Sequence, residues 1–377
     1  MKWLHRVVVV GGGGCGGVLL LAVSLFILVR EGTSASKGVF PVTADADIAN
    51  LPENVQALVR ANLAGIQLAR ARFRQRLITL GDDPWLIFHG ILCEGKDLKL
   101  IDPTSGHNVP VLKYIEGGGG QERRLLETNT TQSTVRFRTS RAPMLYEDHF
   151  CQFLYVLALS GFGKGTYINT GEGGSSGGLE QVFDTALSDV TQLHDLSWFL
   201  PTWCVLGGPS QWTTRFGESV TFDSLVRQHM GNRNEPRCQA CRGTHWCLAL
   251  AYVLKSSEGL LSVESRKAAE TTMGQMLRLA ATAMDDSGGF RLNWNTSREN
   301  QSAEQLLDGR ARLGHQGHML AWVIVSISKE ELQDSEWVHR AVEWLLRELE
   351  ENSDKVKYGE HAHAVRAVKL YHDRYQH

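Results

Sequence analysis

Six apolar segments, each with a histidine inside it or close to its start, recur along the chain and limit the folds open to it. The successive histidines lie 60, 45, 51, 73 and 45 residues apart. A helical hairpin with its loops takes about fifty residues, and self-similarity at such a period is typical of repeat architectures. The histidines are His89, His149, His194, His245, His318 and His363.

More polar, amphipathic segments precede most of these apolar ones. Strand signals are scarce, although residues 135–138 can be read as a strand or an extended loop. Helices of an inner ring touch neighbours on most sides and are apolar nearly all round, whereas outer helices need only one apolar stripe. The pattern therefore predicts an all-α fold, an (α/α)6 toroid. An open superhelix of helix pairs is the alternative. The polar segments are 179–187, 219–228, 262–284 and 335–351.

The N-terminal region has the character of a membrane segment. Residues 7–29 contain no charged side chain, and Lys2 and Arg6 precede them. A helix of about twenty residues spans the roughly 30 Å of a bilayer core, and the basic residues keep its N-terminus cytoplasmic. We expect a membrane anchor over 1–30, a tether over 31–51 and the toroid over 52–377. The protein would then be a single-pass protein of the cell membrane with an extracytoplasmic domain. A cleaved signal peptide is the alternative.

Charge and cysteine content exclude some classes of protein. The formal net charge is −2 and charged residues make up 21% of the chain, which does not favour nucleic acid as a partner. The seven cysteines are sparse and unevenly spaced, so a disulfide-stapled scaffold is not expected.

Several motifs resemble those of known toroid proteins. The loop 284–294, in which a Gly-rich turn precedes an aromatic residue, is similar to the inter-helix loop of squalene-cyclase and prenyltransferase toroids. The region from about Pro84 to Tyr371 resembles a family of uncharacterised exported bacterial α/α-toroid proteins. This resemblance implies the fold and no catalytic role, and the Asp-rich motifs of the cyclases are missing. It rests on residues 147–154, 196–201, 212–217, 243–245 and 317–322.

Four of the histidines, at comparable early positions in their segments, are candidate site residues. In a closed ring His149, His245, His318 and His363 would meet at one mouth of a central cavity. Imidazole can act as a general base, a metal ligand or a pocket wall. We expect at least two of them to line one cavity, with a carboxylate or thiol within reach. The alternative is that each ring bridges neighbouring helices through hydrogen bonds.

Two carboxylates and two cysteines accompany these histidines. Glu147 and Asp148 can orient His149 and raise its basicity, or act as favourable charges at a helix N-terminus. Cys238 and Cys241 precede His245 at a spacing that suits zinc. A Cys238–Cys241 disulfide and free thiols are the alternatives. Toroids that cyclise lanthionine or prenylate protein thiols hold zinc with similar residues at inner-helix starts.

Two functional hypotheses follow. A histidine-lined cavity is a possible site for a small-molecule or glycan ligand. In the first hypothesis, the protein is a non-catalytic binding or assembly module whose cavity is filled by side chains. In the second, it is an enzyme that acts on a cell-envelope glycan or an isoprenoid or lipid-like substrate. A polar cavity with converging histidines and carboxylates would favour the enzyme, whereas a cavity filled by Trp and Leu side chains would favour the module.

Overall fold

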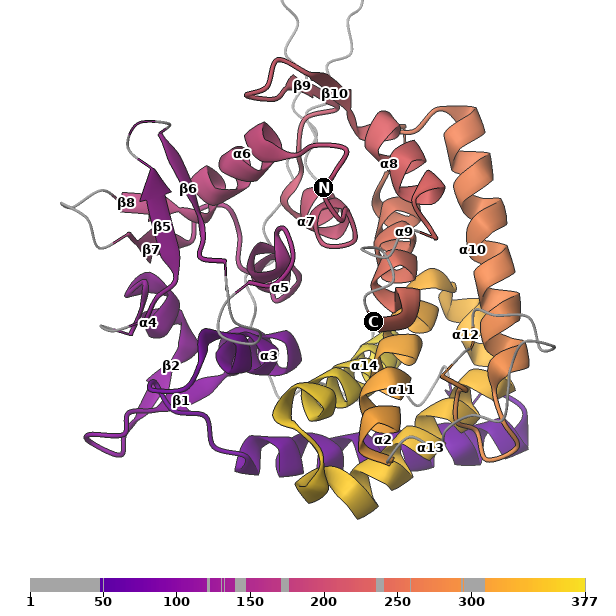
Figure 1. Cartoon of the computed structure of the whole chain (residues 1–377). Coiled ribbons are helices and arrows are strands. Elements are labelled where there is room, and N and C mark those ends of the chain that lie inside the picture. The colour runs from indigo at the N-terminus through magenta and orange to yellow at the C-terminus, as the bar shows by residue number, and fades with distance from the viewer. Residues whose placement is uncertain are drawn as a thin grey trace, which may run out of the picture. The chain divides into compact units, whose positions relative to one another are not determined.

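The computed structural model divides the chain into the units Met1–Pro41 and Val42–His377, and only the second contains described residues. Within that unit the structure is mostly helical, with small two-stranded sheets in the connections (Figure 1). The described residues are 48–49, 51–120, 123–129, 131, 133–139, 147–170, 176–234, 241–257, 259–292, 294 and 309–376.

Six helices pack against one another in cyclic order. Each contacts the next along the chain, and the last contacts the first, so the series closes (Figure 1). The first four of them along the chain are apolar on nearly every side, because each has neighbours on both flanks and a partner outside. The last also carries charged side chains, among them Glu360 and Lys369. The six are α3 (Pro84–Glu94), α5 (Gln152–Leu159), α7 (Phe199–Leu206), α9 (Thr244–Ser256), α11 (Gly309–Ser326) and α14 (Tyr358–Gln376).

A second set of helices lies outside this inner ring. In α13 the buried residues Val338, Val342, Leu345 and Leu349 recur at helical spacing and form one apolar stripe. Helix α13 packs on both α2 and α11. The outer helices are α2 (Glu53–Gln75), α4 (Val111–Glu116), α6 (Leu179–Asp189), α8 (Phe222–Gly231), α10 (Val263–Ala283) and α13 (Glu336–Asn352), with the short α12 (Lys329–Asp334), η1 (Gly95–Asp97) and η4 (Ser353–Lys355) between helices.

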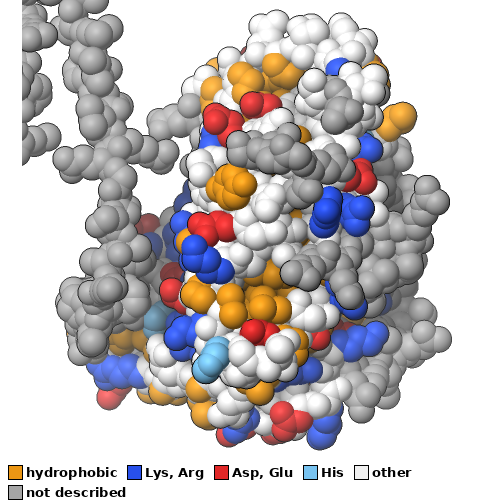
Figure 2. Space-filling view, turned by 90° about the vertical axis from the view of Figure 1, so that its left-hand side faces the viewer, with side chains coloured by type: hydrophobic (Ala, Val, Ile, Leu, Met, Phe, Trp, Pro, Cys, Tyr) orange, Lys and Arg blue, Asp and Glu red, His pale blue; other side chains and the backbone are white. Residues whose placement is uncertain are grey.

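Within the described residues, five antiparallel two-stranded sheets lie in the connections. In the pair β5–β6 the buried residues Leu126 and Phe137 face each other. Figure 2 shows that basic and acidic side chains are interspersed over the face that carries most of these sheets. The strands are β1 (Lys99–Ile101), β2 (Asn108–Pro110), β3 (Gly119–Gly120), β4 (Arg123–Arg124), β5 (Leu126–Asn129), β6 (Thr134–Phe137), β7 (Tyr167–Asn169), β8 (Ser176–Gly178), β9 (Gln211–Thr213) and β10 (Ser219–Thr221).

The expected fold class, an all-α toroid preceded by one transmembrane helix, is wrong on two counts. The connections contain sheets, because their strands pair with strands close by in sequence. Among the described residues, no helix has both the length and the apolar character needed to cross a membrane. The expected span over 7–29 lies outside the described residues. The predicted location, as a single-pass protein of the cell membrane, is wrong for the same reason.

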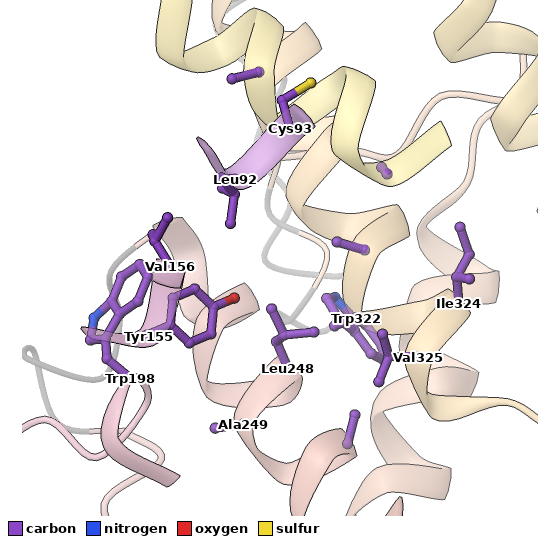
Figure 3. Packing of buried hydrophobic residues seen from close by; sticks show 14 of the residues in the cluster. Leu92, Cys93, Tyr155, Val156, Trp198, Leu248, Ala249, Trp322, Ile324 and Val325 are labelled. Carbon is purple, nitrogen blue, oxygen red and sulfur yellow. The ribbon is translucent and has the colours of Figure 1, made fainter. Parts of the chain in front are cut away.

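The centre of the inner ring is filled by large apolar side chains. In Figure 3 Leu248 of α9 lies between Tyr155 of α5 and Trp322 of α11. Trp322 has no exposed surface, and Tyr155 is 2% exposed. Their burial supplies much of the hydrophobic stabilisation, at roughly 25 cal/mol per Å² of apolar surface removed from water.

Helices α11 and α14 form the most extensively packed pair, and two glycines allow it. A Cβ atom at Gly317 would lie 2.5 Å from the backbone nitrogen of Ala364 and 2.6 Å from the carbonyl carbon of His363. At Gly314 it would lie 2.9 Å from Cγ of Glu360. The two backbones are therefore in contact, which brings His318 and His363 side by side.

Candidate metal centre

Four histidines from four inner helices meet inside the ring. The rings of His318 and His363 lie 3.7 Å apart between centroids, and those of His245 and His318 lie 4.6 Å apart. His363 is 5.1 Å from His89 and 6.1 Å from His245. Helices α3, α9, α11 and α14 thus each contribute one imidazole to this histidine cluster.

One edge of the cluster forms a group that could hold a metal ion. A ligand atom from each of Cys241, His245 and His318 lies within 4.8 Å of the other two. Around tetrahedral zinc, with Zn–S of about 2.3 Å and Zn–N of about 2.0 Å, ligand atoms lie about 3.5 Å apart. A thiol with two imidazoles is a donor set that suits zinc in kind, and the present spacing of up to 4.8 Å is wider than a bound zinc ion requires.

The backbone before α9 places the thiol of Cys241. Cys241, Arg242 and Gly243 have φ values of 49°, 61° and 79°. The first two are strained, because this left-handed region costs a residue with a Cβ atom roughly 1–2 kcal/mol. Thr244 Oγ1 donates to the Cys241 carbonyl at 2.8 Å, and Trp294 Nε1 donates to the Arg242 carbonyl at 3.2 Å. These bonds hold the turn that folds Cys241 back toward His245.

Burial keeps the clustered imidazoles neutral. Desolvation lowers the pKa of His89 to about 4 and that of His318 to about 3. The pKa values of His245 and His363 fall well below the usual 6.5, first through desolvation and then through repulsion from His318. Neutral imidazole is the form that binds metals.

The thiol of Cys241 is uncharged in the absence of a cation. Although the residue as a whole is exposed, desolvation of its thiol raises the pKa to about 11. A bound metal ion reverses this preference, because a coordinated thiol is deprotonated. Cys241 is a free cysteine, so the disulfide alternative is not formed, and Cys238 lies outside the described residues.

The ring nitrogens of this cluster have few protein partners. His89 Nδ1 lies 2.7 Å from the carbonyl of Trp85, which leaves Nε2 with a free lone pair. Within the described part of the chain, no hydrogen bond joins a ring nitrogen of His245, His318 or His363 to another residue. His318 and His363 are half-buried, so water can pair with their ring nitrogens where no protein group does.

His149 lies beside the cluster and outside it. Its ring is 5.5 Å from that of Trp198, which in turn lies 4.0 Å from the ring of His245. Nδ1 of His149 is 4.0 Å from a carboxylate oxygen of Asp195, which is buried. The separation is too long for a hydrogen bond, so the two groups interact only through their charges when His149 is protonated.

The remaining candidates have separate surroundings. Glu147 is buried and its Oε1 accepts a hydrogen bond from the backbone N–H of Phe153 at 2.8 Å, which is a helix N-terminal role. Asp148 is exposed. His194 lies apart from the cluster, where its Nδ1 accepts from the backbone N–H of Thr191 and its ring stacks on Phe150 at 4.0 Å.

Sequence reasoning missed several residues of this centre. His89 was placed in the repeat but not among the candidates, and Asp195 and Trp198 were not singled out. Arg366 is also buried, three residues after His363 on the same helix face. Its guanidinium lies over the ring of Tyr155 at 5.7 Å, and the hydroxyls of Tyr155 and Tyr252 contribute to raising its pKa, against the opposing effect of desolvation. The three-residue spacing from His363 was the available signal.

Comparisons with models of protein families, with characterised proteins and with solved structures found no match for this chain. The resemblance to exported toroid proteins therefore stays a prediction. A fold alone does not define an activity, so function has to be argued from the residues of the site.

Proposed function

We propose that the protein is a zinc enzyme whose metal is bound by Cys241, His245 and His318. The observation that carries this proposal is the proximity of the three ligand atoms, all within 4.8 Å of one another. A thiolate with two imidazoles is a set that suits zinc, and magnesium or calcium would instead require oxygen ligands.

Among the described residues the candidate site offers three protein ligands, the number that is typical of catalytic zinc sites. Structural zinc sites are almost always closed by four protein ligands, whereas catalytic sites have three and keep one position for water or substrate. Bound zinc would supply a water molecule with a pKa of about 7 and would polarise a carbonyl group. His363, beside His318, lies where it can line the open position.

The protein's own residues provide the proton transfer. A general base beside the cluster would take a proton from the attacking water and return it to the leaving group, and His149 is the candidate for this role. Trp198 lies between the rings of His149 and His245, and Asp195 is 4.0 Å from Nδ1 of His149, beyond hydrogen-bond length. Hydrolysis of a carbonyl compound by this route therefore requires Trp198 to move.

A structural zinc site in a non-catalytic module is the competing function, and it is favoured by the Trp322, Tyr155 and Leu248 side chains that fill the centre of the ring. The free cavity at the cluster, lined by His89, Trp198 and His363 among others, has a volume of about 20 Å³. That is room for about one water molecule and not for a substrate. An enzyme therefore needs a second space in which its substrate binds.

Metal binding can be tested with the purified full chain. We expect about one zinc per chain, and after replacement by cobalt a thiolate-to-metal charge-transfer band. Cys241→Ser should abolish this band, and Cys204→Ser, at a half-buried cysteine elsewhere in the ring, should retain it. Absence of bound metal, or a band that persists in Cys241→Ser, would refute the site.

Catalysis needs a separate test. Zinc-loaded protein should hydrolyse p-nitrophenyl acetate, a chelator should abolish the rate, and added zinc should restore it. His149→Gln should lower the rate by roughly 100-fold or more, the usual contribution of a general base. Zinc binding without any chelator-sensitive hydrolysis would instead support the structural site.

A further inference from the structure

A cavity of about 730 Å³ lies at the C-terminal end of α2. It is bounded by the segment after α2, the end of α3, the ribbon β1–β2 and the start of α14. Its volume is within the range of small-molecule sites. Its described lining residues include neither Cys241 nor a histidine of the cluster, so the cavity is a separate site from the metal centre.

Paired backbone forms one wall of this cavity. Lys99 and Ile101 of β1 line it, as do their cross-strand partners in β2. Leu100, between them, faces the opposite side and has no exposed surface. Because side chains alternate along a strand, one face of the ribbon is turned to the cavity. The N–H of Ile101 donates to the carbonyl of Ile78 at 2.8 Å, which ties the ribbon to the segment after α2.

Arg76 presents a fixed guanidinium to the cavity. The carbonyl oxygens of Ser353 and Val356 accept from its Nη1 at 3.3 and 3.1 Å, and Nδ1 of His361 lies 3.2 Å from the same nitrogen. To the described residues, neither Nε nor Nη2 of Arg76 makes a hydrogen bond. A guanidinium that is held by one nitrogen keeps its other donors in a rigid plane, which suits a carboxylate or a phosphate.

Tyr358 adds a buried hydroxyl to the same wall. The residue is 8% exposed, and its hydroxyl has no hydrogen-bond partner among the described residues. Burial raises the pKa of Tyr358, so the hydroxyl stays protonated and can donate. The guanidinium of Arg76 lies 5.5 Å from the centre of the Tyr358 ring, so the two donors are neighbours. Buried polar groups are normally paired, and an anion accepting from both would satisfy this hydroxyl.

The described charges of the wall are positive on balance. Glu94 is buried, but Nε and Nη2 of Arg74 donate to its Oε2 at 2.8 and 2.5 Å and neutralise it. Its Oε1 has no partner among the described residues and could accept from a donor on a ligand. A concave wall with a surplus of one charge attracts ligands of the opposite charge. Outside the Arg74–Glu94 pair, the charged residues of the described wall are Arg76, Lys96, Lys99 and Asp97.

Apolar side chains make up much of the rest of the wall. Phe73 and Leu98 line the cavity and are buried, and the ring of Phe73 lies 5.0 Å from that of Tyr358. Leu77 also lines it and is 70% exposed. An apolar chain or ring that covers these side chains is stabilised by the surface it removes from water.

We propose that this cavity binds an organic anion with an apolar body. Arg76 and Tyr358 hold the carboxylate or phosphate of the ligand, and the apolar body packs on Phe73 and Leu98. Lys96 and Lys99, which are exposed, attract the anion and make its binding weaker at high salt. This site does not depend on the proposed zinc chemistry.

The test uses two fluorescent probes, 8-anilino-1-naphthalenesulfonate and N-phenyl-1-naphthylamine, which share their rings and differ in the sulfonate. On the full chain the anionic probe should bind at least about tenfold more tightly than the neutral one, the usual contribution of a hydrogen bond to a charged group. Octanoate or octyl phosphate should displace it, and the stronger competitor identifies the anion. Octanol should not displace it.

Variants place the probe in this cavity. Arg76→Gln should raise the Kd of the anionic probe at least about tenfold. Lys113→Gln, at an exposed lysine of α4 outside the described wall, is its control and should change nothing. Asn108→Trp fills the cavity from an exposed position and guards against misfolding of Arg76→Gln. Thr104→Trp, in the turn of the same ribbon and outside the described wall, should bind the probe normally.

Three results would overturn the proposal. The first is equal affinity for the two probes, and the second is displacement by octanol as readily as by octanoate and octyl phosphate. The third is an anionic-probe Kd that Arg76→Gln or Asn108→Trp leaves unchanged. Binding should be the same with and without zinc, so failure of the zinc enzyme would leave this site standing.

Discussion

The two sides of the inner ring are built differently. Helices α9, α11 and α14 have 13, 18 and 19 residues, and α11 and α14 touch through their backbones at Gly317. Helices α5 and α7 have only eight residues each, and a cavity of about 640 Å³ lies beside α5. The helices on one side of the ring are long and closely packed, whereas those on the other side are short and lie beside a cavity.

The long side meets a requirement of a metal centre. Metal ligands have to be held on rigid elements with little freedom. The long helices carry His245, His318 and His363, and the short side carries Glu147 and His149. A change made on one side of the ring should leave the properties of the other side unaltered.

Metal binding between the long helices should give the largest change in the free energy of unfolding. A ligand that binds only the folded state at 1,000 times its Kd adds about 4 kcal/mol to the free energy of unfolding. Zinc should therefore raise the melting temperature of the full chain and of Glu147→Gln, but not of Cys241→Ser. Calorimetry measures this, and equal stabilisation of all three proteins would contradict the assigned ligands.

Gly317→Ala should give the next largest effect, a loss of about 3 kcal/mol in the free energy of unfolding. The added Cβ meets backbone atoms of α14, which cannot rotate away, and the displaced helices would also weaken zinc binding. Gly274→Ala in α10 is the control, since its nearest neighbour is a side-chain atom of Arg278 at 3.6 Å, and it should stabilise by up to about 1 kcal/mol. Urea unfolding distinguishes them. Equal effects would show that the backbone contact is not needed.

On the side with the short helices, Glu147 should make the free energy of unfolding depend on pH. Burial raises its folded pKa from 4.5 to about 8, so the folded state holds a proton that the unfolded state releases. The stability from this group is complete below pH 4.5 and is lost as the pH rises to about 8. Glu147→Gln should remove this loss and gain about 2 kcal/mol relative to the parent between pH 5 and pH 8. Parallel stability curves for the two proteins would contradict the protonated state.

The helices could be predicted from the sequence more accurately than the residues of the metal centre. The apolar segments around His89, His245 and His318 lie in helices, because apolar residues on all sides mark a buried helix of this length. The sheets were missed because their strands have two to four residues, too few for an alternating pattern. Of residues 135–138, which the sequence left open between strand and loop, the first three lie in β6 (Thr134–Phe137).

For the site, Cys241 and His245 could be paired from their spacing, but His318 could not. It lies 73 residues after His245, and only the packing of α9 on α11 brings their rings to 4.6 Å. Asp195 was missed for the same reason, since it reaches His149 from the loop before another helix. Contacts that depend on how helices close into a ring leave no local pattern.

The most direct test of the central claim is X-ray absorption at the zinc edge on the full chain loaded with one equivalent of zinc. The account predicts one sulfur at about 2.3 Å with nitrogen ligands at about 2.0 Å. The sulfur should disappear in Cys241→Ser and persist in Cys204→Ser. A first shell of nitrogen and oxygen alone, or a spectrum unchanged by Cys241→Ser, would contradict the metal centre.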